Sequence, residues 1–166
     1  MTDKTLSTLF HDTLRDIYYA ERKILKSLPK MKRAAQSDEL KAAFEKHEAQ
    51  TEGQIERLER VFEIIDKTPR GKTCDAINGI LAEGDEIAEE YKDNPALDAG
   101  LLAAAQAVEH YEITRYGTLK RWATVLGLDE AVKLLDETLQ EESQTDEDLT
   151  KLADARINDA ALKDAA

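Results

Sequence analysis

The stretch VEHYEITRYGTL, residues 108–119, places two carboxylates where a helix should present apolar side chains. As a helix at about 100° per residue, its apolar face contains Val108 and Tyr116. Glu112 lies in the middle of that face, and Glu109 lies one turn earlier. An ionised carboxylate taken out of water costs several kcal/mol unless it is paired, hydrogen-bonded or bound to a metal. The two glutamates therefore predict partners elsewhere in the chain.

The composition favours one all-α domain over residues 1–166. Hydrophobic residues make up 42% and charged residues 35%, with only 7 Gly and 3 Pro, a balance typical of long helices. We expect the core to span residues 3–152 and the tail, residues 153–166, to fray or pack loosely. Cys74 is the only cysteine, which excludes an intrachain disulfide and a cysteine-based zinc cluster.

The charge pattern argues against two classes of partner. Acidic residues outnumber basic residues by 35 to 23, and no basic stripe with interleaved aromatic residues occurs, so we expect no nucleic-acid partner. The N-terminus does not resemble a signal peptide, and no run of about 18 apolar residues suggests a membrane span. We therefore expect a cytoplasmic protein without membrane contact.

The spacing of apolar residues predicts four long helices, over residues 3–35, 37–65, 96–126 and 128–152. KTPRGK, residues 67–72, is typical of a turn. The weaker pattern from Cys74 to Tyr91 predicts a short extra helix within a long crossover. Two helical hairpins joined in this way indicate an up-down-down-up four-helix bundle.

An internal repeat supports two related hairpins. HEAQTE, residues 47–52, resembles EESQTD, residues 141–146, which lies 94 positions later. At a similar offset of 91 positions, Glu21 aligns with Glu112. The repeat pairs the unusual acids of the two halves.

Every long helix then has an acid on or beside its apolar face. These acids are Glu21, Glu48, Glu109, Glu112 and Glu142. Clustered in one bundle they would repel one another by several kcal/mol unless they are protonated or neutralised by cations. Two divalent metal ions bridged by glutamates meet that need, and hard oxygen ligands suit iron or manganese.

Other interpretations of these residues stay open. Glu48 lies at the edge of its apolar face and could extend to solvent. His47 is either an auxiliary metal ligand or a hydrogen-bonded core histidine. A purely structural alternative pairs the acids with nearby cations, for which Arg22, Lys23 and Arg115 are candidates.

Four runs of the chain resemble the YciE/YciF group of ferritin-like proteins, which are bacterial and stress-associated. They are LRDIYYAERKILKSLPKM, HEAQTEGQIERLERVF, AAQAVEHYEITRYGTL and TLQEESQTDEDLTKLA. The resemblance implies a ferritin-like bundle, usually a homodimer, with a rubrerythrin-like arrangement of metal ligands. It implies a ligand role for Glu21 in the first helix, Glu48 in the second, Glu109 and Glu112 in the third, and Glu142 in the fourth.

The chain departs from the usual di-iron pattern at two positions. That pattern has a histidine three residues after the second-helix and fourth-helix glutamates, where this chain has Thr51 and Thr145. His47 and Asp146 could substitute for the missing histidines. The rubredoxin-like cysteine module of rubrerythrins is also absent from this sequence.

Two functions follow as competing expectations. In the first, the cluster holds two iron ions, or two manganese ions, and reacts with peroxide or dioxygen as a ferroxidase or a peroxide-detoxifying enzyme. In the second, a non-enzymatic stress protein uses the same bundle for metal sequestration or as a structural or interaction module.

Overall fold

The computed structural model describes residues 4–163, which form helices and no β-strand. The long helices are α1 (Leu6–Ala34), α2 (Asp38–Ile64), α4 (Leu97–Val125) and α5 (Asp129–Leu152). The shorter helices are α3 (Asp75–Glu90), in the crossover, and α6 (Asn158–Ala161), near the end of the chain. The predicted all-α class, the four long helices and the crossover helix are confirmed.

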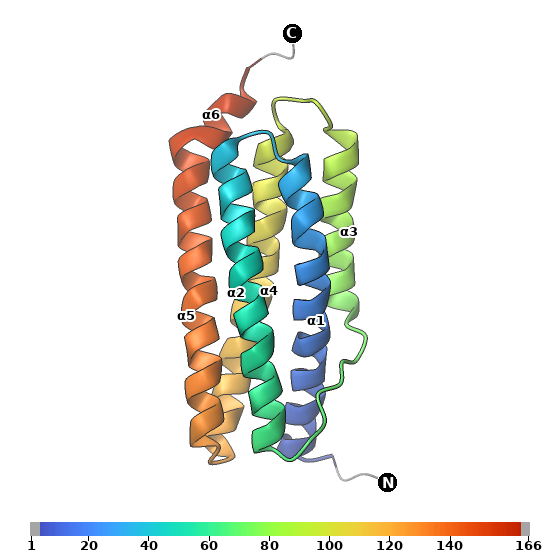
Figure 1. Cartoon of the computed structure of the whole chain (residues 1–166), viewed down its shortest axis with the longest axis vertical. Helices are drawn as coiled ribbons and strands as arrows, with labels where there is room; N and C mark the ends of the chain where they lie inside the picture. Colours follow the sequence, from blue (N-terminus) through green and yellow to red (C-terminus); the bar gives the residue numbers. More distant parts are fainter. Residues whose placement is uncertain (1–3, 164–166) are drawn as a thin grey trace.

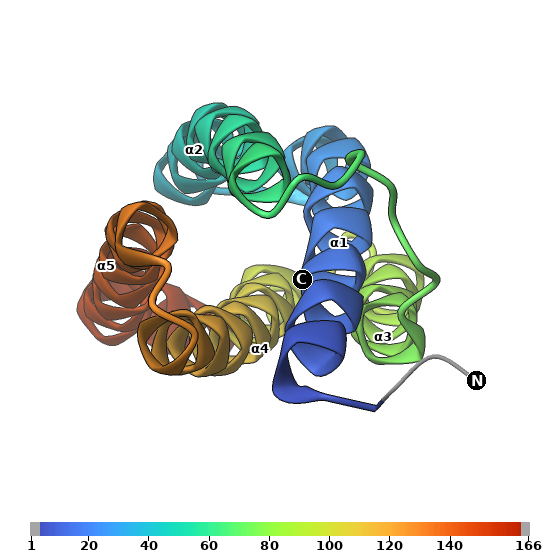
Figure 2. The same cartoon turned by 90° about the horizontal axis from the view of Figure 1, so that it is seen from below.

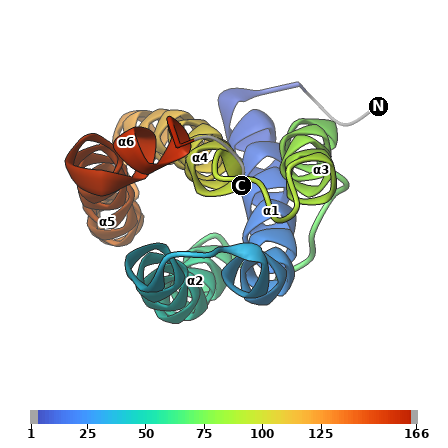
Figure 3. The same ribbon diagram turned by 90° about the horizontal axis from the view of Figure 1, so that it is seen from above.

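The four long helices form an up-down-down-up bundle. α1 and α5 run in one direction, and α2 and α4 run in the opposite direction (Figure 1). Seen along the bundle axis, α1, α2, α5 and α4 follow one another around the interior, while α3 lies outside against α1 and α4 (Figures 2 and 3). One long crossover between two antiparallel hairpins is the connectivity of ferritin-like folds.

The buried residues follow the helical period that the sequence predicts. In α1 they include Phe10, Leu14, Ile17, Ile24 and Leu28, at steps of three, four or seven residues. α4 buries side chains over a wider part of its circumference because α1, α3 and α5 all pack against it. No described helix combines the length and apolar composition that a membrane crossing requires.

The hairpin turns use local chemistry that the sequence carries. The Ser37 hydroxyl accepts a hydrogen bond from the Leu40 amide (3.1 Å) at the start of α2. Gly127 ends the turn after α4 with a φ of +70°, a left-handed conformation that suits glycine. These caps fix where each hairpin reverses.

A buried carboxylate ties the first hairpin to the start of α4. Asp98 accepts hydrogen bonds from the backbone amides of Gln36 (2.8 Å) and Ser37 (2.7 Å), in the turn between α1 and α2. Because the turn amides precede α2 and Asp98 lies in the first turn of α4, this contact sets the two hairpins relative to each other.

The crossover is fastened to α1 before α3 begins. The Lys72 amide donates to the Arg15 carbonyl (3.1 Å), and Arg15 Nε donates to the Arg70 carbonyl (3.3 Å). Gly71 passes so close to α1 that a Cβ there would lie 3.1 Å from the Cβ of Tyr19. The absence of a side chain at Gly71 therefore lets the loop follow α1 toward α3.

The C-terminal segment differs from the expected loose tail. Residues Ala153–Ile157 form a π-helical turn that continues α5, and α6 follows it. Ala153 and Ile157 are buried, and the segment packs on α4 at one end of the bundle (Figure 3). Most other side chains of residues 154–163 are exposed, so this helical segment packs on the bundle mainly through these two residues. Residues 164–166 lie outside the described part.

We expect Asp98→Ala to lower the free energy of unfolding by about 1–3 kcal/mol because it leaves two backbone amides without their acceptor. Urea denaturation would measure the change. Asp129→Ala is the matched control, because Asp129 also lies in the first turn of a long helix but is exposed. If both variants lost the same free energy of unfolding, Asp98 would contribute no more than the favourable interaction of an acidic residue with the helix dipole.

Candidate metal centre

Four glutamates and one histidine lie buried in the interior of the bundle. Glu21 (α1), Glu109 and Glu112 (α4) and Glu142 (α5) are 0% exposed, and His47 (α2) is 3% exposed. Each of the four long helices therefore contributes a polar side chain to the core. The two glutamates of α4 are three residues apart and share one helical face.

Four of these residues bring donor atoms together. His47 Nδ1 lies 3.1 Å from Glu109 Oε1, and His47 Nε2 lies 3.8 Å from both Glu112 Oε2 and Glu142 Oε2. One ligand atom from each of the four residues lies within 4.8 Å of the other three. This spacing suits a divalent cation held by three carboxylates and one imidazole.

Most of these atoms form no hydrogen bond within the protein. Both oxygens of Glu109 and of Glu112, one oxygen of Glu142, one oxygen of Glu21 and His47 Nε2 are buried without a hydrogen bond. A buried polar atom without a partner costs free energy. A metal ion would satisfy several of these atoms at once, so the residues present fit a metal.

Burial controls the protonation of this cluster without a metal. Burial, and next the neighbouring Glu142, raise the pKa of Glu109 and of Glu112 well above the usual range. Burial, and next the charge of Glu142, raise the pKa of Glu21 to about 8. Burial lowers the pKa of His47. Because burial favours the protonated carboxyls, a metal ion would compete with protons for these groups.

Two uncharged side chains hold the outermost carboxylates in place. The buried Tyr116 hydroxyl donates a hydrogen bond to Glu21 Oε1, and Gln54 Nε2 donates a hydrogen bond to Glu142 Oε1. From the sequence, core packing is the preferred prediction for Tyr116 over a hydrogen bond to a ligand, and Gln54 is assigned no role. The helical phase could have indicated both, because Gln54 lies two turns after His47 and Tyr116 lies one turn after Glu112.

His47 takes the interior position on α2, and Glu48 does not. Glu48 is half-buried and lies outside the group of four residues. Burial in α2 and α5 matches best at an offset of 95 residues, which pairs His47 with Glu142 and Leu40 with Leu135. The sequence repeat at 94 residues instead aligned Glu48 with Glu142, so its register differs by one residue, or about 100° of helix rotation.

Asp146 also lies outside the group. It accepts hydrogen bonds from Gln106 Nε2 (3.1 Å) and pairs with the exposed His110 through Nε2 (3.1 Å). Its carboxylate links α5 to α4 beside the cluster. Whether Glu48 or Asp146 ever binds a metal stays a prediction.

The two threonines at the usual histidine positions, Thr51 and Thr145, each form a hydrogen bond to the backbone of their own helix. The Thr51 hydroxyl donates to the His47 carbonyl (2.8 Å), and the Thr145 hydroxyl donates to the Glu141 carbonyl (3.0 Å). Both bonds join residues four positions apart in one helix. The hydroxyl protons are therefore directed away from the carboxylate cluster.

Cations of the protein do not neutralise the buried acids. Arg22, Lys23 and Arg115 lie over the rings of Tyr18, Tyr19 and Tyr111, respectively. Within residues 4–163, no lysine or arginine forms an ion pair with any of the four buried glutamates. The structure thus weakens the purely structural interpretation.

The fold and this cluster define a class: a ferritin-like helical bundle with a buried carboxylate and imidazole group suited to metal binding. The chain belongs to the family described as "Domain of unknown function (DUF892)", whose model matches residues 5–162. It is 44% identical to Protein YciF of Escherichia coli (strain K12) over 163 residues, which cover 97% of this chain and 98% of that protein.

Solved structures support the same relationship. The crystal structure of the E. coli stress protein YciF superposes with a TM-score of 0.89 at 43% identity, covering 94% of this chain and 99% of that one. YcfI from Rhodopseudomonas palustris gives a TM-score of 0.86 at 46% identity, covering 89% and 94% of the two chains. The predicted resemblance to the YciE/YciF group is confirmed.

The raised pKa of Glu21 predicts a pH-dependent stability of the metal-free protein. In the folded protein the Glu21 carboxyl has a pKa of about 8, whereas in the unfolded chain it has its ordinary pKa of 4.5. The free energy of unfolding therefore decreases as the pH rises from 4.5 to 8, because the unfolded chain loses this proton first. Glu21→Gln removes that loss. We expect the free energy of unfolding of the variant, relative to wild type, to increase by a few kcal/mol from pH 5 to pH 8.

Urea denaturation of the metal-free proteins at the two pH values would measure this difference. Glu48→Gln is the matched control, since it makes the same substitution at a half-buried position outside the cluster. A Glu21→Gln difference that stays constant with pH would contradict a protonated Glu21 in the folded protein.

Proposed function

We propose that this protein is a di-metal carboxylate oxidoreductase of the stress response, which binds iron or manganese and reacts with dioxygen or peroxide. The observation that carries the proposal is the convergence of His47, Glu109, Glu112 and Glu142 within 4.8 Å in the buried interior. Function in stress is inferred from the relationship to the E. coli stress protein YciF.

The donor set favours iron or manganese over softer metals. Carboxylate oxygens are hard ligands, and a single imidazole extends the set to ions of intermediate softness. Zinc sites of the structural type use thiolates, and Cys74 does not belong to the group. The buried environment would also keep bulk water from competing with these side chains for the ion.

A second ion would need ligands beyond the group of four, and Glu21 is a buried glutamate outside that group. Its Oε2 atom is buried without a hydrogen bond, and the Glu112 side chain next to it has two such oxygens. We assign the first metal position to His47, Glu109, Glu112 and Glu142. Glu112 would be shared with a second position that includes Glu21.

Two ferrous ions would supply the two electrons that, with two protons, convert dioxygen to hydrogen peroxide, or hydrogen peroxide to two water molecules. The protein contributes by holding the carboxylates close together and by excluding bulk water from them. Carboxyl protons of Glu109 and Glu112, displaced when a metal binds, are a local source of acid.

Metal sequestration without turnover is the second candidate function. It is favoured by Thr51 and Thr145, whose hydroxyls bond the helix backbone at positions where di-iron enzymes of this fold have histidine. A site poorer in imidazole could bind metal without supporting repeated redox cycles. Iron titration with an oxidant separates the two functions.

A homodimeric state, a cytoplasmic location and the lack of a nucleic-acid partner are further parts of the proposal. Dimerisation and the bacterial stress role are supported by the family resemblance alone. Sedimentation equilibrium would test the dimer directly.

Replacing two ligands should abolish tight metal binding. We expect the double variant Glu112→Gln/Glu142→Gln to lose bound iron and manganese but to keep its helicity, because glutamine keeps the shape of each side chain and removes the charge. Metal analysis after dialysis and circular dichroism would measure both properties. Glu52→Gln, at an exposed position of α2, is the control and should keep its metal. Metal retained by the double variant would refute the ligand assignment.

If the proposal is correct, the metal-free protein should bind two ferrous ions per chain at saturation in an anaerobic titration. A pulse of dioxygen or peroxide should then produce the absorbance of oxo-bridged ferric iron faster than free iron oxidises. Binding without accelerated oxidation would favour sequestration, and absence of binding would overturn both functions.

A further inference from the structure

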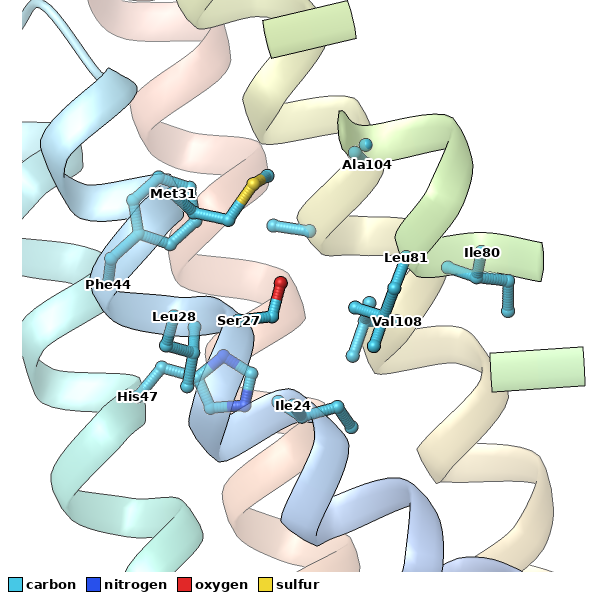
Figure 4. A pocket seen from close by; sticks show the side chains of 12 residues that line it. Ile24, Ser27, Leu28, Met31, Phe44, His47, Ile80, Leu81, Ala104 and Val108 are labelled. Atoms are coloured by element: carbon cyan, nitrogen blue, oxygen red, sulfur yellow. The ribbon is translucent and has the colours of Figure 1, made fainter. Parts of the chain in front are cut away.

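A small apolar cavity lies beside His47, between α1, α2, α3 and α4 (Figure 4). Its volume is about 30 Å³, enough for one diatomic molecule but not for an organic substrate. Ser27 and His47 are the only polar side chains among its lining residues. The cavity therefore meets the candidate metal centre at the imidazole.

Small residues leave this space open. Gly84 of α3 faces Ala104 of α4, and a Cβ at Gly84 would lie 3.5 Å from the Ala104 Cβ and 3.6 Å from the Met31 Cε. Larger side chains at these positions would fill the cavity. Its existence thus depends on the packing of the crossover helix against the bundle.

The cavity adjoins an outer groove of about 360 Å³ between α1 and α3. Ser27 and Leu81 line both spaces, so they mark the boundary between the groove and the interior. They lie on opposite sides of the cavity (Figure 4). Lys30 of α1 and Asp85 of α3 form a solvent-exposed ion pair (2.8 Å) across the groove.

We propose that this cavity is the entry route for dioxygen to the metal centre, and that Leu81 is its gate. The inference rests on the proposed function and deepens it by naming the oxidant. The route runs from the outer groove past Ser27 and Leu81, through the cavity, to His47.

The lining selects for an apolar oxidant. Hydrogen peroxide would have to give up hydrogen bonds to water, and only the Ser27 hydroxyl and the His47 ring could replace them. Dioxygen has no such bonds to lose. In the reaction it takes one electron from each of two ferrous ions and two protons, and leaves as hydrogen peroxide.

Stopped-flow oxidation of the iron-loaded protein tests the route. We expect Leu81→Trp to slow oxidation by dioxygen about tenfold and Leu81→Ala to accelerate it, with iron stoichiometry unchanged in both variants. Ala76→Trp is the matched control, because Ala76 is an exposed alanine of α3 that lines neither the cavity nor the outer groove. Its rate should equal that of the wild type.

Two results would overturn the route. Equal dioxygen rates in wild type and Leu81→Trp would show that the gate is not on the path. An equal slowing of the peroxide reaction in Leu81→Trp would show that the passage does not select dioxygen.

Dissolved xenon gives a readout that needs no metal, since xenon binds apolar cavities. We expect xenon to shift the methyl resonances of Leu81 and Val108 in the wild type but not in Ala104→Leu, whose larger side chain fills the cavity. Absence of iron binding together with a xenon shift would reject the proposed function and the oxidant role, while confirming the cavity. Absence of the xenon shift with normal iron binding would reject the route alone.

Discussion

The burial of four carboxyl groups and one imidazole in the same part of the bundle is the constraint on which the rest of this structure depends. Such groups stay in a core only when they are neutral, hydrogen-bonded or bound to a cation. Without a metal, burial raises the pKa of Glu21 to about 8 and raises the pKa of Glu109 and of Glu112 well above the usual range, which favours the protonated carboxyls. The same proximity that makes the cluster costly in the metal-free protein prepares it for a divalent ion, so stability and metal affinity are linked.

The surroundings of the cluster restrict how its members can move. Tyr116 and Gln54 each bond one oxygen of a glutamate and leave the other oxygen without a protein partner. Glu109 and Glu112, by contrast, form no hydrogen bond through either oxygen, although Glu109 Oε1 lies 3.1 Å from His47 Nδ1. One part of the ligand set is therefore positioned by hydrogen bonds, and the other part is free to adapt to an ion.

The crossover also matters to the proposed chemistry. It connects the two hairpins, and its hydrogen bonds to α1 through Arg15 and Lys72 precede α3. α3 then packs against both α1 and α4. There α3 supplies Leu81 and Gly84 to the cavity wall beside His47. A segment that is peripheral to the four-helix bundle thus controls the access that we infer for dioxygen.

The sequence by itself determined the helices, their connectivity and the acids that occupy the centre of the apolar faces, because helical periodicity and turn residues are local properties. It did not decide between His47 and Glu48, since adjacent residues differ by about 100° around a helix and only the packing of α2 against α1 and α5 fixes that angle. Tertiary structure also decided the hydrogen bonds of Glu21 and Glu142 and the cavity. Each of these joins helices far apart in sequence, so no local pattern contains it.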